Sequence, residues 1–172
     1  MKIISINGQA GTGKTATAKV LLGKLGNSAY ISGDALVAVN PFGVNEKTDR
    51  LIIKNSISLI KNLEQANYDN VIICGILRNQ AQFDSFLNNL GEKADFLFVW
   101  LRATKEVRHK RKIKRARDEA DNPEWFDFID KIIPDADAES FNLKRGEYLE
   151  IDTSNKTPEE VVKIIKNKIV KK

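Results

Sequence analysis

A glycine-rich stretch near the start of the chain constrains the fold more than any other feature. It is Gly8-Gln9-Ala10-Gly11-Thr12-Gly13-Lys14-Thr15, and it satisfies the pattern G-x-x-x-x-G-K-[ST] at every fixed position. An apolar run precedes it and a helical stretch follows it, which is the context that this pattern requires. The alternative is an ordinary glycine-rich turn, but the complete motif in this context favours a loop that binds a nucleoside triphosphate.

The chemistry of this stretch predicts how ATP and Mg²⁺ would be held. Glycines let the backbone curl so that several N–H groups point inward and enclose the β-phosphate. The helix that begins near Lys14 adds the positive end of its dipole. Lys14 is expected to reach the β- and γ-phosphates, and the Thr15 hydroxyl is expected to ligate Mg²⁺. The expected ATP contacts are Gly8, Ala10, Gly11, Thr12, Gly13, Lys14, Thr15 and Ala16.

Apolar runs alternate with helical stretches along the whole chain, which indicates an α/β fold. Strands are predicted at Lys2–Asn7, Ser28–Ser32, Asn70–Cys74, Asp95–Leu101 and Tyr148–Asp152. Helices are predicted at Lys14–Leu25, Lys47–Asn67, Asn79–Leu90 and Pro123–Ile133, after Thr104, and after Thr157 as N-cap. Strands separated by helices imply right-handed crossovers, so we predict a three-layer α/β/α fold with a five-stranded parallel sheet. A length of 172 residues suits a single domain, residues 1–172.

Composition excludes several classes of protein. The chain is 42% hydrophobic, which is enough to fill a core and too much for intrinsic disorder. Cys74 is the only cysteine, so a disulfide scaffold is excluded and a reducing cytosol is favoured. No apolar run approaches the roughly 18–20 residues of a membrane span. We therefore expect a cytoplasmic protein without a membrane partner.

Positive charge is concentrated in one segment. The net charge is +5, from 28 Lys and Arg against 23 Asp and Glu, and seven of the 28 bases lie within Arg108–Arg117. Without this segment 21 bases face 23 acids, so the remainder of the chain is close to neutral. Such a segment attracts phosphate on a nucleotide or a nucleic acid, and it is also compatible with a solvated helix face. His109, the one histidine, is expected to face solvent among these cations.

Beyond the glycine loop, the chain resembles the nucleotide-kinase branch of P-loop proteins, the adenylate-kinase-like enzymes and related small-molecule kinases. Ile31-Ser32-Gly33-Asp34 resembles the I-S-x-G-D stretch that lies at their acceptor site. Gly75-Ile76-Leu77-Arg78, with Gln82, resembles the segment whose arginine holds the acceptor phosphate. The resemblance implies the strand order 2-3-1-4-5, with the P-loop after the first strand.

The same resemblance assigns roles to the basic segment and to the end of the last strand. Arg111, Arg115 and Arg117 stand where such kinases carry lid arginines that close over the transferring phosphoryl group. A short helical lid over residues 104–122 is therefore implied, with these arginines among the catalytic residues beside Lys14 and Asp34. Asp152-Thr153-Ser154 resembles the loop that packs near the adenine.

Two positions depart from the family pattern. The third strand of these kinases ends in an aspartate that supports Mg²⁺, and Cys74 stands there instead. They also carry an arginine three residues after the aspartate that Asp34 matches, where this chain has Val37. The loss of that arginine weakens the case for an ordinary nucleoside monophosphate. It leaves room for an acceptor that presents a hydroxyl, as in gluconate-, shikimate- or antibiotic-kinase relatives.

Asp34 and Arg78 are the candidate acceptor-binding residues. Ligands of open α/β sheets bind along the carboxyl edge, where Asp34 should emerge. Asp34 would orient or deprotonate a hydroxyl acceptor, or order Mg²⁺-bound water if the acceptor carries a phosphate. The plainer alternatives are an Asp34 that caps the following helix and an Arg78 at the surface.

Together these features predict a kinase that moves the γ-phosphoryl of ATP, with Mg²⁺, to a small-molecule acceptor. A nucleotide or nucleoside-like acceptor is favoured, and a non-nucleotide hydroxyl compound is the next candidate. A nucleic-acid partner would make the protein a polynucleotide 5′-end kinase, which the basic segment supports to a lesser degree. An ATPase without an acceptor is the remaining alternative.

Overall fold

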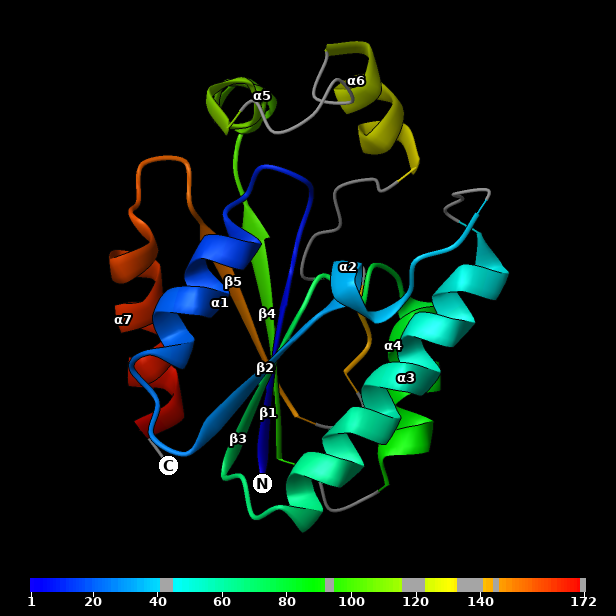
Figure 1. Ribbon diagram of the computed structural model, residues 1–172. Coiled ribbons are helices and arrows are strands. Elements are labelled where there is room, and N and C mark those ends of the chain that lie inside the picture. Colours follow the sequence, from blue (N-terminus) through cyan, green and yellow to red (C-terminus); the bar gives the residue numbers. More distant parts are fainter. Residues whose placement is uncertain (41–44, 92–94, 116–122, 133–140, 144–145, 171–172) are drawn as a thin grey trace.

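The computed structural model of the protein describes residues 1–40, 45–91, 95–115, 123–132, 141–143 and 146–170. Within these residues five strands form one parallel sheet in the order β2-β3-β1-β4-β5, which confirms the predicted topology (Figure 1). The strands are β1 (Lys2–Asn7), β2 (Ser28–Ser32), β3 (Asn70–Cys74), β4 (Asp95–Arg102) and β5 (Glu147–Asp152).

Helices cover both faces of the sheet. They are α1 (Lys14–Leu22), α2 (Gly33–Leu36), α3 (Glu46–Gln65), α4 (Gln80–Leu90), α5 (Lys105–Arg115), α6 (Pro123–Ile132) and α7 (Pro158–Val170). Helices α1 and α7 lie on one face and α3 and α4 on the other, while α5 and α6 lie beyond the carboxyl ends of the strands (Figure 1). This is the predicted three-layer architecture, and it leaves the carboxyl edge of the sheet to α2, α5 and α6.

Strand β4 shows why a continuous apolar run forms a central strand here. Its side chains alternate between two cores, because successive residues of a strand point to opposite faces. Phe96, Phe98 and Trp100 enter the core under α3 and α4. Leu97, Val99 and Leu101 enter the core under α1 and α7. Both faces of β4 are therefore buried, and alternation of polar and apolar residues is not needed.

Some helix ends differ from the sequence prediction. Helix α1 ends at Leu22 instead of Leu25, with Gly23 as its C-cap. The Leu21 carbonyl accepts from both the Lys24 N–H (3.0 Å) and the Leu25 N–H (3.0 Å), so the chain leaves the helix through a tight turn. The predicted N-cap at Thr157 is confirmed: its Oγ1 accepts from the Glu160 N–H at 3.3 Å, and Glu160 Oε2 accepts from the Thr157 N–H at 2.8 Å.

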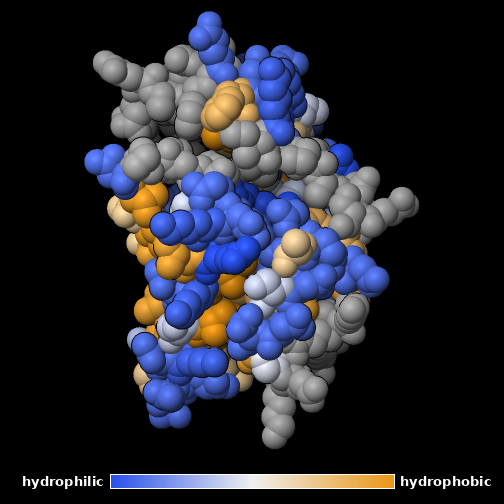
Figure 2. Space-filling view, turned by 90° about the vertical axis from the view of Figure 1, so that its right-hand side faces the viewer, coloured by the Kyte–Doolittle hydropathy of each residue, from blue (hydrophilic) through white to orange (hydrophobic). Residues whose placement is uncertain are grey.

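Helix α3 separates the core from solvent on one side of the molecule. Ile53, Ile57 and Ile60 point into the core, whereas Leu51 and Leu59 stay partly exposed. Figure 2 views the molecule from this side, and its surface is mainly hydrophilic with smaller apolar patches. None of the helices in the described residues has the length and apolar character that crossing a bilayer requires.

Candidate active site

The predicted phosphate loop connects β1 to α1 and has the curled backbone that its glycines allow. Gly8, Gly11 and Gly13 all have positive φ, at +132°, +88° and +95°. The Thr12 hydroxyl donates to the Gln9 carbonyl at 2.8 Å, which closes the curl from inside. A Cβ at Gly8 would stand 2.1 Å from the Leu101 carbonyl oxygen, so only glycine lets the loop pass over the end of β4.

Lys14 lies at the centre of this loop. Its Nζ donates to the Gly8 carbonyl at 2.8 Å and to the Gln9 carbonyl at 2.9 Å. Burial lowers the pKa of this amine, while Cys74 and Asp34 oppose that effect and the neighbouring cations Lys112 and Arg108 add to it. Lys14 is therefore a buried amine among groups of both charges, and a polyanion such as a triphosphate would stabilise its charged form.

The end of β3 approaches the same amine. Gly75 has a φ of +70°, and a Cβ there would lie 3.6 Å from the Lys14 Cε atom. Cys74 is buried, and burial raises the pKa of its thiol although the Lys14 charge opposes this. The thiol is therefore neutral and cannot replace the carboxylate that related kinases carry here. In the described residues no group of three or more His, Cys, Asp or Glu side chains could hold a metal.

Asp34 is brought to this edge by α2. Gly33 begins the helix and fits closely against β3, because a Cβ there would stand 2.9 Å from the Gly75 carbonyl oxygen. Asp34 is exposed, and its charge acts on the pKa values of both Lys14 and Cys74. The carboxylate is not engaged in capping α2 in the described part of the chain. The structure therefore brings Asp34 and Lys14 to one site.

Arg78 has a partner that sequence reasoning missed. Its guanidinium forms an ion pair with Asp49 of α3, and the two side chains are only 20% and 19% exposed. Gln82 connects the pair, since its Nε2 donates to Asp49 Oδ2 at 2.7 Å and its Oε1 accepts from the Arg78 N–H at 2.8 Å. Arg78 is thus a half-buried arginine with an ion-pair partner inside the protein. The only sequence signal for Asp49 was an acid in the first turn of a predicted helix.

The basic segment packs directly on the phosphate loop. A Cβ at Gly11 would stand 2.6 Å from the Arg108 carbonyl oxygen, so α5 contacts the loop backbone without a gap. Arg108 Nη1 donates to the Ala10 carbonyl at 3.3 Å. The guanidinium also donates twice to Asp130 of α6, at 2.7 and 2.9 Å, and Arg108 is only 4% exposed. A fully solvated helix face is therefore excluded for α5.

Two further side chains of α5 turn inward toward α6. Lys112 is buried and its Nζ lies 4.1 Å from the centroid of the Phe126 ring. His109 was expected to face solvent, and this is wrong: its side chain is 19% exposed and its Nε2 lies 3.3 Å from Asp130 Oδ2. The physical reason is the packing of α6 on α5, which a list of neighbouring cations does not reveal.

Of the three arginines expected in the lid, the structure describes the side chain of Arg111 alone. Arg111 donates to the Thr153 carbonyl at 2.6 Å and to its hydroxyl at 3.2 Å, so it lies over the loop after β5. The Thr153 hydroxyl in turn donates to the Thr12 carbonyl at 2.9 Å, which joins that loop to the phosphate loop. Arg115 ends α5 but its side chain lies outside the described residues, as does the whole of Arg117.

Comparison with known families and structures agrees with this geometry. A family model described as "AAA domain" matches residues 4–128, which include the phosphate loop, Asp34 and Arg78. The chain belongs to this AAA-domain family. A search of the curated proteins finds no match for the sequence.

Solved structures place this AAA-domain protein among P-loop kinase folds. A sugar kinase from Janibacter sp. HTCC2649 has a TM-score of 0.74 at 13% identity, over 97% of this chain and 93% of that one. A gluconokinase from Sinorhizobium meliloti 1021 has a TM-score of 0.62 at 16% identity, over 94% and 87%. Chaetomium thermophilum Kti12 in complex with ADP-AlF3 has a TM-score of 0.63 at 13% identity, over 96% and 97%. At these identities the likeness shows the fold.

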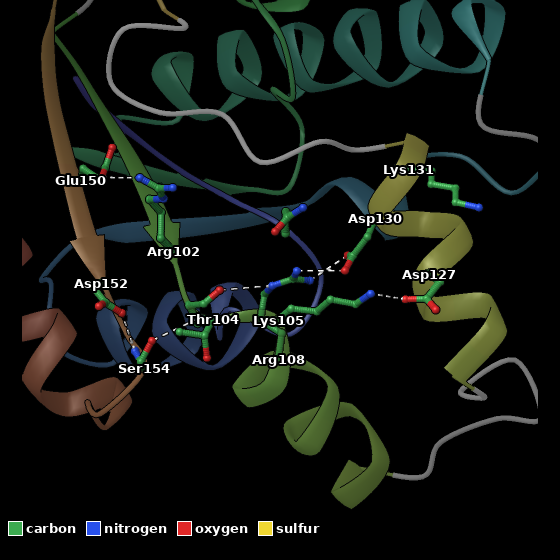
Figure 3. A pocket seen from close by; sticks show the side chains of 12 residues that line it. Arg102, Thr104, Lys105, Arg108, Asp127, Asp130, Lys131, Glu150, Asp152 and Ser154 are labelled. Atoms are coloured by element: carbon green, nitrogen blue, oxygen red, sulfur yellow. Dashed lines mark hydrogen bonds and ion pairs between the residues drawn. The ribbon is translucent and has the colours of Figure 1, made fainter.

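A cleft of about 810 Å³, lined mainly by charged residues, opens beside the phosphate loop of this AAA-domain protein (Figure 3). Gln9 of the loop, the ends of β4 and β5, and the facing sides of α5 and α6 line it. Its charged residues are four cations and four anions: Arg102, Lys105, Arg108, Lys131, Asp127, Asp130, Glu150 and Asp152. Three of the cations form ion pairs within the cleft, with Glu150, Asp127 and Asp130 (Figure 3). The cleft thus carries no net charge.

Proposed function

We propose that the protein is an ATP-dependent phosphotransferase that moves the γ-phosphoryl group to a small acceptor. The observation that carries this proposal is the meeting of Lys14, Asp34 and the turn after β3 at one edge of the sheet. A phosphate cradle with an exposed carboxylate beside it is suited to transfer, because the carboxylate can position the acceptor. The sugar kinase and gluconokinase that share the fold support this proposal.

Each residue then has a defined task. The N–H groups of the loop and Lys14 would hold the β- and γ-phosphates, and Thr15 would ligate Mg²⁺. Mg²⁺, when bound, supplies further neutralisation of the phosphate charge. Arg111 and, from the expected lid over residues 104–122, Arg115 and Arg117 would complete that neutralisation. Residues 1–172 would work as one domain, in the cytoplasm.

Transfer itself requires little covalent chemistry from the protein. The acceptor hydroxyl oxygen forms a bond to the γ-phosphorus while the bond from that phosphorus to the β–γ bridging oxygen breaks. ADP leaves with the electron pair of the broken bond. The hydroxyl proton passes to the carboxylate of Asp34, which is exposed and can release it to water.

Two other functions receive less support. A polynucleotide end kinase would use the basic segment as a cationic surface, but Arg108 and Lys112 of α5 are buried and Arg111 is engaged with Thr153. An ATPase without an acceptor would use a carboxylate at the end of β3 to activate water, and the neutral thiol of Cys74 cannot do so. A small molecule with a hydroxyl, nucleoside-like or not, is the better acceptor.

The test is a transfer assay with γ-labelled ATP and Mg²⁺. The acceptor panel contains nucleosides, nucleoside monophosphates, sugars, sugar acids and oligonucleotide 5′ ends. We expect label on at least one small molecule, none on the oligonucleotides, and loss of all transfer in Lys14→Ala. Hydrolysis of ATP with no labelled product from any acceptor would refute the phosphotransferase.

A further inference from the structure

The ion pair between Arg78 and Asp49 bears on which acceptors the site accepts. Asp49 uses both carboxylate oxygens: Oδ1 pairs with the Arg78 guanidinium and Oδ2 accepts from Gln82 Nε2 at 2.7 Å. The same Gln82 accepts from the Arg78 N–H at 2.8 Å, and Gln82 itself is buried. The charge of Arg78 is therefore balanced from within the protein before any ligand arrives.

This cluster lies within reach of the phosphate loop. The Gly75–Arg78 segment starts beside Lys14, where a Cβ at Gly75 would be 3.6 Å from Lys14 Cε. Its third residue is tied to the end of β1, because the Leu77 N–H donates to Asn7 Oδ1 at 3.1 Å. Three residues span at most about 10 Å. An acceptor beside the γ-phosphate could thus contact the Arg78–Asp49 pair directly.

A phosphate group fits this pair poorly. To bind Arg78 it must either share the guanidinium with the Asp49 carboxylate, where two anions repel, or displace Asp49 and leave a mostly buried carboxylate without its cation. A hydroxyl group meets neither obstacle. It can donate to an Asp49 oxygen and accept from an Arg78 N–H while the ion pair stays intact.

We propose that Asp49 is a specificity-determining residue that restricts the acceptor to uncharged hydroxyl compounds and excludes phosphorylated ones. The proposal rests on the proposed function, because it describes the acceptor of that same reaction. Asp49 acts by forming an ion pair with Arg78. It does not contact ATP, and it takes no part in the proton transfer.

The test compares matched pairs of acceptors, each a hydroxyl compound and its own phosphate monoester, in wild type and Asp49→Asn. Wild type should phosphorylate the uncharged member. Asp49→Asn keeps the shape and releases the Arg78 charge, so kcat/KM for the monoester should rise about ten- to hundredfold relative to the uncharged member. The matched control is Glu46→Gln. It alters an exposed acid that lies three residues earlier on α3 and pairs with Arg50, so the ratio of the two kcat/KM values should stay as in wild type.

A binding measurement separates this inference from the proposed function. Protein loaded with Mg²⁺ and ADP is titrated with inorganic phosphate by calorimetry, so the loop is filled and no turnover is needed. Asp49→Asn should bind phosphate at least tenfold more tightly than wild type, and the double variant Asp49→Asn/Arg78→Gln should lose that gain. Unchanged phosphate binding in a folded Asp49→Asn protein would overturn the role of Asp49, whether or not wild type transfers phosphoryl groups. A wild type that prefers the monoester would overturn the acceptor class.

Discussion

The contact between Arg108 and Asp130 should be one of the main supports of α5 and α6. Asp130→Ala removes both 2.7–2.9 Å hydrogen bonds to a guanidinium whose residue is only 4% exposed. Breaking a buried ion pair from one side typically costs about 3–5 kcal/mol, because the remaining charge stays desolvated. Arg108 keeps the Ala103 and Ala10 carbonyls at 3.3 Å, so we expect the lower end, about 3 kcal/mol.

Amide hydrogen exchange is the assay, since it reports the opening of α5 and α6 separately from global unfolding. Asp127→Ala is the matched control on the same helix, because its ion pair with Lys105 is largely exposed and should contribute little to stability. The double variant Arg108→Met/Asp130→Leu should cost clearly less than the two single variants summed, since no orphan charge remains. If Asp130→Ala resembles Asp127→Ala, the pair is screened by solvent and the reasoning fails.

Four further outcomes are expected. Lys14→Ala should abolish transfer and strongly weaken binding of ATP with an unchanged circular dichroism spectrum; near-normal turnover would mean that the loop is not the active site. Gly11→Ala should cost about 1–3 kcal/mol, because its φ is +88° and its methyl group meets the Arg108 backbone; thermal melts measure this, and an unchanged melting temperature would contradict it. Burial raises the pKa of Asp130, but Arg108 and His109 outweigh it and hold that pKa below its usual value. The stabilisation by Asp130 is thus complete above the unfolded pKa near 4 and lost as pH falls through the lower folded value. Protection of α5 should therefore decline more steeply below about pH 4 in wild type than in Asp130→Asn. Asp34→Asn should lower kcat about 10²–10⁴-fold with little change in KM, and an unchanged kcat would remove Asp34 from the reaction.

Much of the fold could be predicted because its signals are local. A continuous apolar run such as Asp95–Arg102 forms a strand when both faces of its sheet are covered by helices. The strand order was predicted from the resemblance to nucleotide kinases. The position of Asp34 beside Lys14 was predictable for a related reason, since parallel strands all deliver their following residues to one edge. Helix ends were less accurate: α1 ends at Leu22 with Gly23 as its C-cap, and the Leu21 carbonyl accepts from the turn that follows.

The side-chain partners could not be predicted in this way. Asp49 and Arg78 are 29 residues apart, and Arg108 and Asp130 are 22 apart. The sequence spacing of these residues does not predict that they form ion pairs. Each contact depends on how two separate helices or turns pack against one another. The inward orientation of His109 and Lys112 has the same origin in the docking of α6.

The sequence by itself therefore determined the phosphate loop, the parallel sheet and the edge of the sheet at which Lys14 and Asp34 lie. These depend on backbone freedom at glycines and on periodic burial, both of which act over a few neighbouring residues. Only the tertiary structure decided which charges are already paired: Arg78 is balanced by Asp49, and Arg108 by Asp130. The energy of a charge depends on every group within several ångströms and on its distance from water, and packing sets both.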